Sequence, residues 1–154
     1  MSIQIVSTAF ADSQPIPAKY TCEGQNISPP LRWSTLPLST KSHAIIVDDP
    51  DAPSGVWVHW VIYNLPSSIA ELFEGIPKLQ LLPAGVMQGL NSWPRLGYDG
   101  PCPPPGKPHR YFFKIYALDT MLNLKAGVTK NDVLREMRSH ILDEGQLMGT
   151  YQRK

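Results

Sequence analysis

Two histidines carry the chemistry that this sequence suggests, because each follows a proline-rich loop and has an aromatic neighbour. His59 follows the loop of residues 49–55, and His109 follows the proline-rich residues 100–108. Imidazole rings and the phenol of Tyr111 can donate hydrogen bonds to the oxygen atoms of an anion. If the two strands that begin at these loops are neighbours, the side chains converge on one rim, together with the carboxylate of Asp49. The pattern therefore predicts a site for a small anion.

The first loop is stiff, because Pro50 and Pro53 fix their own φ angles and keep the preceding residues out of helical geometry. Tight proline turns are where cis peptide bonds occur, so we consider a cis bond before either proline. Asp49 stands at the end of a predicted strand and is expected to orient His59 or to bind backbone amides. Asp51 is expected to cap the turn.

The second loop combines glycine with consecutive prolines. Gly100 is one of three glycines here whose backbone can approach a ligand closely. Residues 103–105 are all proline and favour an extended polyproline conformation. Two other roles for this stretch stay open, a rigid crossover or a target for proline-reading modules. His109 and Tyr111 then leave the loop on the same side of the next strand.

Strands must position these residues, and strands dominate the pattern. Apolar and β-branched runs bounded by turn residues predict strands over residues 2–6, 43–48, 56–64, 110–118 and 147–151. In the third run, strict alternation places Trp57, His59, Val61 and Tyr63 on one face, and Val58, Trp60 and Ile62 on the other. Both faces are apolar, so this strand is expected at the centre of a sheet, covered on both sides.

Helices are few. Thr129 and Asp132 have the spacing of a capping box, and an apolar stripe follows to Ile141, with Gly145 as the expected stop. A shorter helical turn is expected over residues 67–73. We therefore expect a single domain over residues 1–154, mainly β, with an antiparallel β-sandwich core and a few peripheral helices.

Composition excludes several classes of protein. The 154 residues carry 14 basic and 13 acidic side chains without a charged block, which argues against nucleic-acid binding. No apolar run is long enough for a transmembrane helix. The N-terminus lacks the basic residues of a signal peptide, so we expect a cytoplasmic protein. Cys22 and Cys102 are then expected as reduced thiols, with a single disulfide after export as the alternative.

Motifs for catalysis and for cofactors are absent from the sequence. It has no Gly-x-Ser-x-Gly, no phosphate-binding Gly-x-x-x-x-Gly-Lys and no His-Glu-x-x-His, so no cofactor and no metal are expected. The first hypothesis is a non-enzymatic protein that binds a small phosphorylated or otherwise anionic ligand and regulates a partner through that site. One alternative is a hydrolase or isomerase that uses His59 and His109 as acid and base. Another is a protein-interaction module whose working surface is the proline-rich loop.

The order and spacing of the motifs resemble one family over nearly the whole chain. The motifs lie at residues 19–24, 26–33, 49–53, 59–60, 89–91, 100–104, 109–111 and 147–153. Together they resemble the phosphatidylethanolamine-binding proteins, also called Raf kinase inhibitor-like proteins, in their bacterial and archaeal branch. The chain departs from eukaryotic members in its short loop between Asp51 and Trp57, so kinase inhibition is not transferred on the fold alone.

The resemblance implies a sandwich of antiparallel sheets and a small pocket for phosphate-like groups. It also implies that Arg110 points away from the pocket into an ion pair, and it is compatible with a homodimer and a protein partner. By motif, the pocket residues would be Asp49, Ala52, Pro53, Trp57, His59, Gly100, Pro103, Pro104, His109 and Tyr111.

Overall fold

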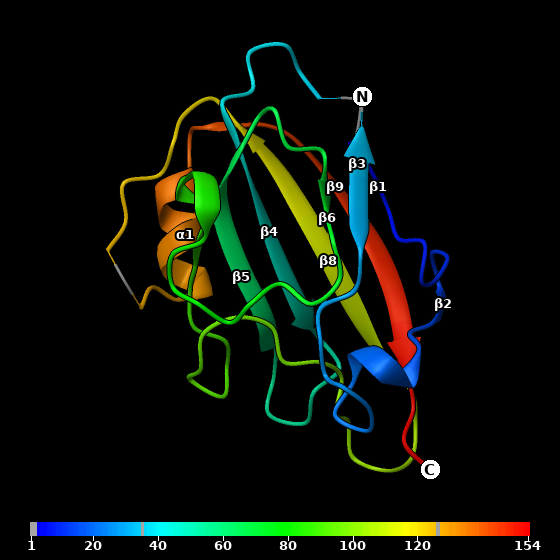
Figure 1. Cartoon of the computed structure of the whole chain (residues 1–154). Helices are drawn as coiled ribbons and strands as arrows, with labels where there is room; N and C mark the ends of the chain where they lie inside the picture. Colours follow the sequence, from blue (N-terminus) through cyan, green and yellow to red (C-terminus); the bar gives the residue numbers. More distant parts are fainter. Residues whose placement is uncertain (1–2, 35, 126) are drawn as a thin grey trace.

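The computed structural model describes residues 3–34, 36–125 and 127–154, and it consists of two sheets and a short α-helix (Figure 1). The larger sheet has the strand order β2-β9-β8-β4-β5-β7, and the smaller has the order β1-β3-β6. The strands are β1 (Gln4–Val6), β2 (Gln14–Pro15), β3 (Leu31–Ser34), β4 (Ser42–Asp49), β5 (Trp57–Pro66), β6 (Glu71–Leu72), β7 (Met87–Gln88), β8 (His109–Leu118) and β9 (Ile141–Tyr151). The helix is α1 (Lys130–Met137), and two 3₁₀ turns are η1 (Ala18–Tyr20) and η2 (Pro83–Gly85).

Strand β4 lies inside the larger sheet, between β5 and β8, and pairs antiparallel with both. All eight of its residues are buried, because apolar layers cover both faces of the sheet. Apart from β2, which runs parallel to β9, the described strand pairs are antiparallel. The predicted mainly-β sandwich is confirmed. Ser2, the first residue of the predicted first strand, lies outside the described residues.

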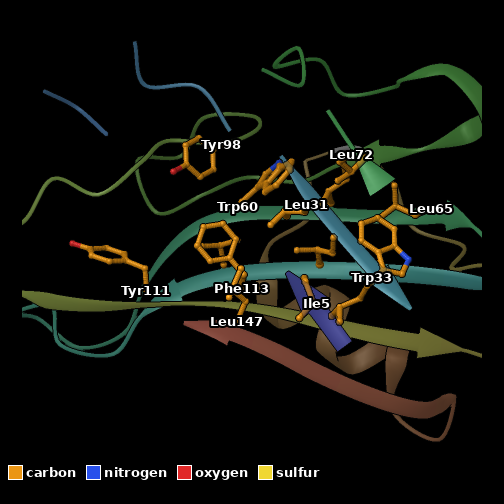
Figure 2. Close-up of a cluster of buried hydrophobic side chains, with 14 of the residues drawn as sticks. Ile5, Leu31, Trp33, Trp60, Leu65, Leu72, Tyr98, Tyr111, Phe113 and Leu147 are labelled. Atoms are coloured by element: carbon orange, nitrogen blue, oxygen red, sulfur yellow. The ribbon is translucent and has the colours of Figure 1, made fainter. Parts of the chain in front are cut away.

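Each face of the larger sheet has its own core. Between the two sheets lies a cluster that includes Leu31, Trp33, Trp60 and Phe113 (Figure 2). On the opposite face, Val61, Tyr63 and Ala44 pack with Val133 and Met137 of α1 and with the segment that precedes this helix. The aromatic side chains dominate the first core, and burial of such side chains is the main stabilising contribution to the fold.

A β-bulge at His59 breaks the predicted alternation of β5. In the register of β4 with β5, Val47 pairs with Trp60 and Asp48 pairs with Val58, so His59 is the extra residue. Val58 and Val61 therefore pack on the side of the helix, whereas Trp60 packs between the sheets. The sequence predicted that Trp60 faces the opposite side of the strand from Trp57 and His59. The extra residue reverses the alternation after His59, so this prediction was wrong.

The helix begins as predicted and ends early. Thr129 and Asp132 form a reciprocal capping box. The helix ends at Met137, and a positive φ of 73° at Ser139 turns the chain into β9. The expected stop at Gly145 was wrong, because Gly145 lies within β9. A Cβ atom there would stand 2.0 Å from the carbonyl oxygen of Ile3, so this glycine permits close packing of the N-terminal segment.

One other expectation was wrong, and one open possibility is not realised. Residues 67–73 do not form a helical turn but lead into the short strand β6, in which Leu72 pairs with Leu31. The structure contains no cis peptide bond among its described residues, so the prolines of the first loop are trans. No helix in the described part of the chain is long and apolar enough to cross a membrane.

Candidate functional site

A cavity of about 250 Å³ lies at the end of the larger sheet where β4 ends and β5 and β8 begin. In Figure 1 this is the end of the sheet near the C-terminus. The two proline-rich loops and a segment around Trp93 form its walls. The lining residues are Asp49, Ala52, Pro53, Ser54, Trp57, His59, Trp93, Cys102, Pro103, Pro104, His109 and Tyr111.

Nine of the ten residues predicted for the site line this cavity, and Gly100 does not. The amide of Gly100 donates a hydrogen bond of 2.7 Å to Oδ1 of Asn26. A Cβ atom at Gly100 would stand 2.0 Å from the carbonyl oxygen of Tyr20. Gly100 therefore allows two backbone segments to pack closely, and its backbone lies beside His59 without lining the cavity.

The sequence did not reveal three lining residues, Ser54, Trp93 and Cys102. Trp93 packs edge-on against Trp57, with ring centres 5.5 Å apart, and edge-on against His59 at 5.1 Å. The indole thus closes one side of the cavity and holds the imidazole of His59. Nothing in the pattern around Trp93 distinguishes it from other loop residues, because its role depends on a contact across 34 positions in the chain.

His59 is almost completely buried, with an exposed fraction of 2%. Its Nδ1 lies 2.6 Å from the carbonyl oxygen of Asp99, and because a carbonyl oxygen can only accept, Nδ1 carries the proton and donates. Burial lowers the pKa of His59, against the opposing effects of the Asp99 backbone and of the Asp49 and Asp99 carboxylates. The ring is therefore neutral near pH 7, and Nε2 is an unprotonated acceptor.

Asp49 orients the other histidine. Nδ1 of His109 donates to Oδ2 of Asp49 over 2.7 Å, and the amide of Asp51 donates to Oδ1 over 2.7 Å. Asp49 is buried, with an exposed fraction of 3%. The expectation that Asp49 binds a backbone amide is confirmed. The alternative was that Asp49 orients His59, but the hydrogen bond from Nδ1 of His59 is accepted by the backbone carbonyl of Asp99.

Tyr111 places a buried phenol in the cavity without a partner. Its side chain lies edge-on to His59, with ring centres 5.2 Å apart, and stacks near His109 at 6.5 Å. The hydroxyl makes no well-aligned hydrogen bond within the described structure, although the carboxylate of Asp49 lies close enough to act on it. Burial raises the pKa of Tyr111 far above its usual value, and the carboxylates of Asp49 and Asp51 act in the same direction. Figure 2 shows this hydroxyl at the edge of the core, pointing away from the packed side chains.

An ion pair pins the first loop to β8. The guanidinium of Arg110 donates from Nε and from another nitrogen to the two carboxylate oxygens of Asp51, each over 2.9 Å. The amide of Arg110 also donates to Asp51 over 2.9 Å. These contacts lower the pKa of Asp51 to about 2. The predicted structural role of Arg110, away from the cavity, is confirmed.

A second network holds the backbone that orients His59. Nitrogen atoms of Asn26 and Asn91 donate to the buried carboxylate of Asp99 over 3.1 Å and 2.8 Å. Lys78 and Arg95 complete this network from the surface, with nitrogen–oxygen distances of 3.2 Å and 3.3 Å. The Asp99 carbonyl is therefore a rigid acceptor, and the tautomer of His59 is set by contacts beyond the cavity.

Cys22 and Cys102 form a disulfide, so the expectation of two reduced thiols was wrong. Their Cα atoms are 5.4 Å apart, although 80 positions separate them in the sequence. Cys102 lines the cavity, and the amide of Cys22 donates to the carbonyl of Pro101 over 3.1 Å. The disulfide therefore ties the proline-rich loop, and with it one wall of the cavity, to the segment after η1.

A larger hollow of about 1110 Å³ lies beside the smaller sheet, and its chemistry is different. Exposed apolar side chains such as Phe73 and Leu79 line it, and Arg32 and Glu71 are its charged residues. It has no histidine, and Arg32 is its one basic residue. Among the described residues, no group of three or more His, Cys, Asp or Glu side chains could hold a metal ion.

Known proteins resemble this chain over almost its full length. A UPF0098 protein of Methanothermobacter thermautotrophicus is 54% identical over 145 residues, which cover 94% of this chain and 95% of that protein. A UPF0098 protein of Chlamydia trachomatis is 45% identical, with 98% of this chain and 99% of the relative covered. These names describe no activity.

Solved structures agree with the sequence relatives. The crystal structure of a homolog of phosphatidylethanolamine-binding protein from Chlamydia trachomatis superposes with a TM-score of 0.90 at 43% identity, covering 99% of each chain. That of Escherichia coli YbcL, described as a member of the mammalian family, superposes with a TM-score of 0.92 at 32% identity and full coverage of both chains. The model of the family described as phosphatidylethanolamine-binding protein matches residues 6–152. The chain belongs to the phosphatidylethanolamine-binding protein family, alongside bacterial and archaeal members.

Proposed function

We propose that this protein binds a small phosphorylated or otherwise anionic ligand in the cavity at His59 and His109. The observation that carries the proposal is the hydroxyl of Tyr111, a buried donor without a partner that borders the cavity. A buried polar group without a hydrogen bond is costly, and such groups are rare unless a ligand or water satisfies them. A ligand oxygen would supply the missing partner.

The size and the walls of the cavity support a small ligand. At about 250 Å³ it lies just below the usual range for ligand pockets, so it suits a single phosphoryl-sized group with a short substituent. Trp57 and Trp93 supply an apolar wall, and the prolines of both loops keep the site rigid before binding. A preformed site reduces the entropic cost of ordering the protein around its ligand.

We propose binding without catalysis. Ser54 is the one serine that lines the cavity, and no described hydrogen bond joins it to His59 or His109, whose Nδ1 atoms are occupied by Asp99 and Asp49. A serine without a base is a weak nucleophile. Incubation with p-nitrophenyl phosphate should release no product above the background rate, and release that disappears in a His109→Gln variant would restore the enzyme hypothesis.

The test of binding uses two matched tyrosines. Tyr111→Phe removes the hydroxyl in the cavity, and Tyr63→Phe removes another buried hydroxyl without a partner, on the opposite face of the sheet. Isothermal titration with inorganic phosphate and with phosphoethanolamine should give binding to the wild type. We expect about tenfold or greater loss of affinity in Tyr111→Phe, as for a hydrogen bond to a charged group, and no change in Tyr63→Phe. Equal affinities in all three proteins, or no binding to the wild type, would refute the proposal.

The partner and the location of the protein remain predictions. A regulated protein partner and a homodimer can be tested by sedimentation velocity of the purified chain alone and with cell extract fractions. A cytoplasmic location is harder to reconcile with the Cys22–Cys102 disulfide, because outside hyperthermophiles disulfides persist mainly in oxidising compartments. Alkylation of free thiols in intact cells checks this, since modification of Cys22 and Cys102 is expected only if the compartment is reducing.

A further inference from the structure

We propose that the Cys22–Cys102 disulfide is a redox switch for the cavity, and that a dithiol which reduces it lowers the affinity of the cavity for its ligand. The inference rests on the proposed function and adds the regulation of that site. Three features of the disulfide carry it. The bond is accessible, it braces a wall of the cavity, and that wall has few other ties to the protein.

The disulfide connects the surface of the protein with the cavity. Cys22 and Cys102 are both exposed, so a reductant in solution can reach the bond. Cys102 also lines the cavity, and the next two residues, Pro103 and Pro104, line it as well. A change in the redox state of the disulfide therefore acts on residues that border the ligand.

The wall that contains Cys102 has little capacity for hydrogen bonds, because residues 101–108 include five prolines. Proline has no amide proton, so the backbone of this segment has few donors. The described hydrogen bonds that tie the segment to the rest of the protein come from Cys22, Gln152 and Arg153. The disulfide is thus the covalent tie of a segment that is otherwise weakly attached.

The other end of the disulfide belongs to a well-ordered support, the segment after η1. The hydroxyl of Thr21 donates to the carbonyl of Ala18 over 2.9 Å and accepts from the amide of Glu23 over 3.2 Å. The amide of Gly24 donates to the carbonyl of Thr21 over 3.0 Å. Cys22 lies within this network, so reduction leaves the support in place and frees the wall.

The reduction step has a preferred direction. A guanidinium nitrogen of Arg153 lies 3.8 Å from Sγ of Cys102 and stabilises negative charge on that sulfur, whereas an acidic residue, Glu23, follows Cys22. A thiolate of the dithiol therefore attacks Sγ of Cys22, the S–S bond breaks, and its electron pair leaves on Cys102. The second thiolate of the reductant then displaces Cys22. The reductant is oxidised to a disulfide, and its two electrons and two protons pass to the cysteines.

Reduction changes affinity through the fraction of molecules in which the wall is in place. In the oxidised protein, the wall is ordered before the ligand binds. In the reduced protein, the ligand must order the wall, and the apparent affinity falls in proportion to the fraction already in the binding geometry. A fraction of about one tenth gives a loss of about tenfold. The hydrogen bond from Nε of Arg153 to the carbonyl of Pro103, 2.8 Å long, keeps the wall near the cavity, so the loss is partial.

Isothermal titration of the oxidised and the reduced protein tests the switch, with inorganic phosphate and phosphoethanolamine as probes. We expect the affinity to be at least about tenfold lower in dithiothreitol than in its absence. A Cys22→Ser/Cys102→Ser variant has no bond to reduce. It should bind as weakly as the reduced wild type, and dithiothreitol should not change its affinity.

A matched control separates a freed wall from a general loss of stability. Val133→Ala leaves a cavity in the core on the opposite face of the larger sheet, with the disulfide intact. This variant should be less stable and should retain the wild-type affinity for phosphate. A loss of affinity as large as that caused by reduction would show that binding follows global stability, and it would overturn the switch.

Hydrogen exchange shows directly which segment reduction releases. Exchange in the reduced wild type should be faster at Gly106 and Lys107, while the amides of β4 and β8 stay protected. Faster exchange throughout β4 and β8 would mean global unfolding and would contradict a local switch. The direction of attack is read by mass spectrometry after brief exposure to glutathione, a monothiol, which should be attached to Cys22. Attachment to Cys102 would contradict the assigned direction.

The outcomes separate the switch from the proposed function. Phosphate that binds the oxidised and the reduced protein with equal affinity would overturn the switch and leave anion binding intact. Failure of both probes to bind the oxidised protein would instead reject the proposed function, and the switch with it.

Discussion

Removal of the Cys22–Cys102 disulfide should destabilise the protein strongly, because this bond closes a long loop. The cysteines are 80 positions apart, and the chain-entropy relation for a loop of that length gives about 4.5 kcal/mol at 25 °C. Native disulfides typically contribute about 2–5 kcal/mol when measured by removal. Since domains are stable by only about 5–15 kcal/mol, the bond accounts for a large share of the stability.

The assay is urea unfolding of a Cys22→Ser/Cys102→Ser variant, followed by tryptophan fluorescence. Both cysteines are exposed, so serine should add little packing cost of its own. We expect a lower midpoint and a steeper dependence on urea, because the unfolded chain without the cross-link exposes more surface. A loss of about 4 kcal/mol corresponds to a fall in Tm of roughly 8–16 °C for a chain of this length.

Reductant supplies the control and the refutation. Dithiothreitol should shift the wild type to the stability of the double variant and should leave the variant unchanged. The fold should survive, because Nε of Arg153 still donates to the carbonyl of Pro103 over 2.8 Å and holds the loop. A loss of stability below about 1 kcal/mol, with the disulfide shown by mass spectrometry to be formed in the wild type, would refute the entropic reasoning.

Three further substitutions test other parts of the fold. Burial lowers the pKa of His43 to about 4, whereas the same histidine in the unfolded chain has a pKa near 6.5, so the free energy of unfolding should fall by about 3 kcal/mol as the pH drops from about 6.5 to 4. His43→Phe should flatten this pH dependence in urea unfolding, and an unchanged pH dependence in the variant would contradict the argument. Thr129→Ala removes the helix cap and should cost about 1 kcal/mol in the same assay, unless the cap is not formed in solution. Gly100→Ala places a Cβ atom 2.0 Å from the carbonyl oxygen of Tyr20 and should cost about 2 kcal/mol or more in thermal unfolding, and a neutral effect would show that this contact is not close.

The sequence predicted most of the sheet and most of the cavity, because both depend on local patterns. Runs of β-branched and aromatic residues located the central strands to within two residues at their ends. The proline loops flank these strands, so the residues at the adjoining strand ends lie together around the cavity. The last strand was predicted to begin at residue 147, whereas β9 begins at Ile141. A polar stretch with charged residues has little strand signal, and its pairing with β8 overrides its local preference.

Features that depend on distant contacts could not be predicted in this way. The bulge at His59 adds one residue to β5, and an inserted residue leaves no trace in a short alternating pattern. The disulfide joins segments 80 positions apart, and the expectation of thiols rested on the presumed compartment. Trp93 reaches His59 from a glycine- and proline-rich segment without periodicity, where sequence reasoning has no basis for placing a side chain.

The two histidines appear equivalent in the sequence, and the structure makes them different. His59 is held by a backbone carbonyl, deep behind Trp93, so its free nitrogen is an acceptor. His109 is held by a carboxylate, and its side chain is 12% exposed. The ring of Tyr111 lies edge-on to His59 and stacks near His109, so one phenol lies beside both histidines. Two imidazoles that are equivalent in the sequence are thus held by partners of different charge, a neutral carbonyl for His59 and a carboxylate for His109.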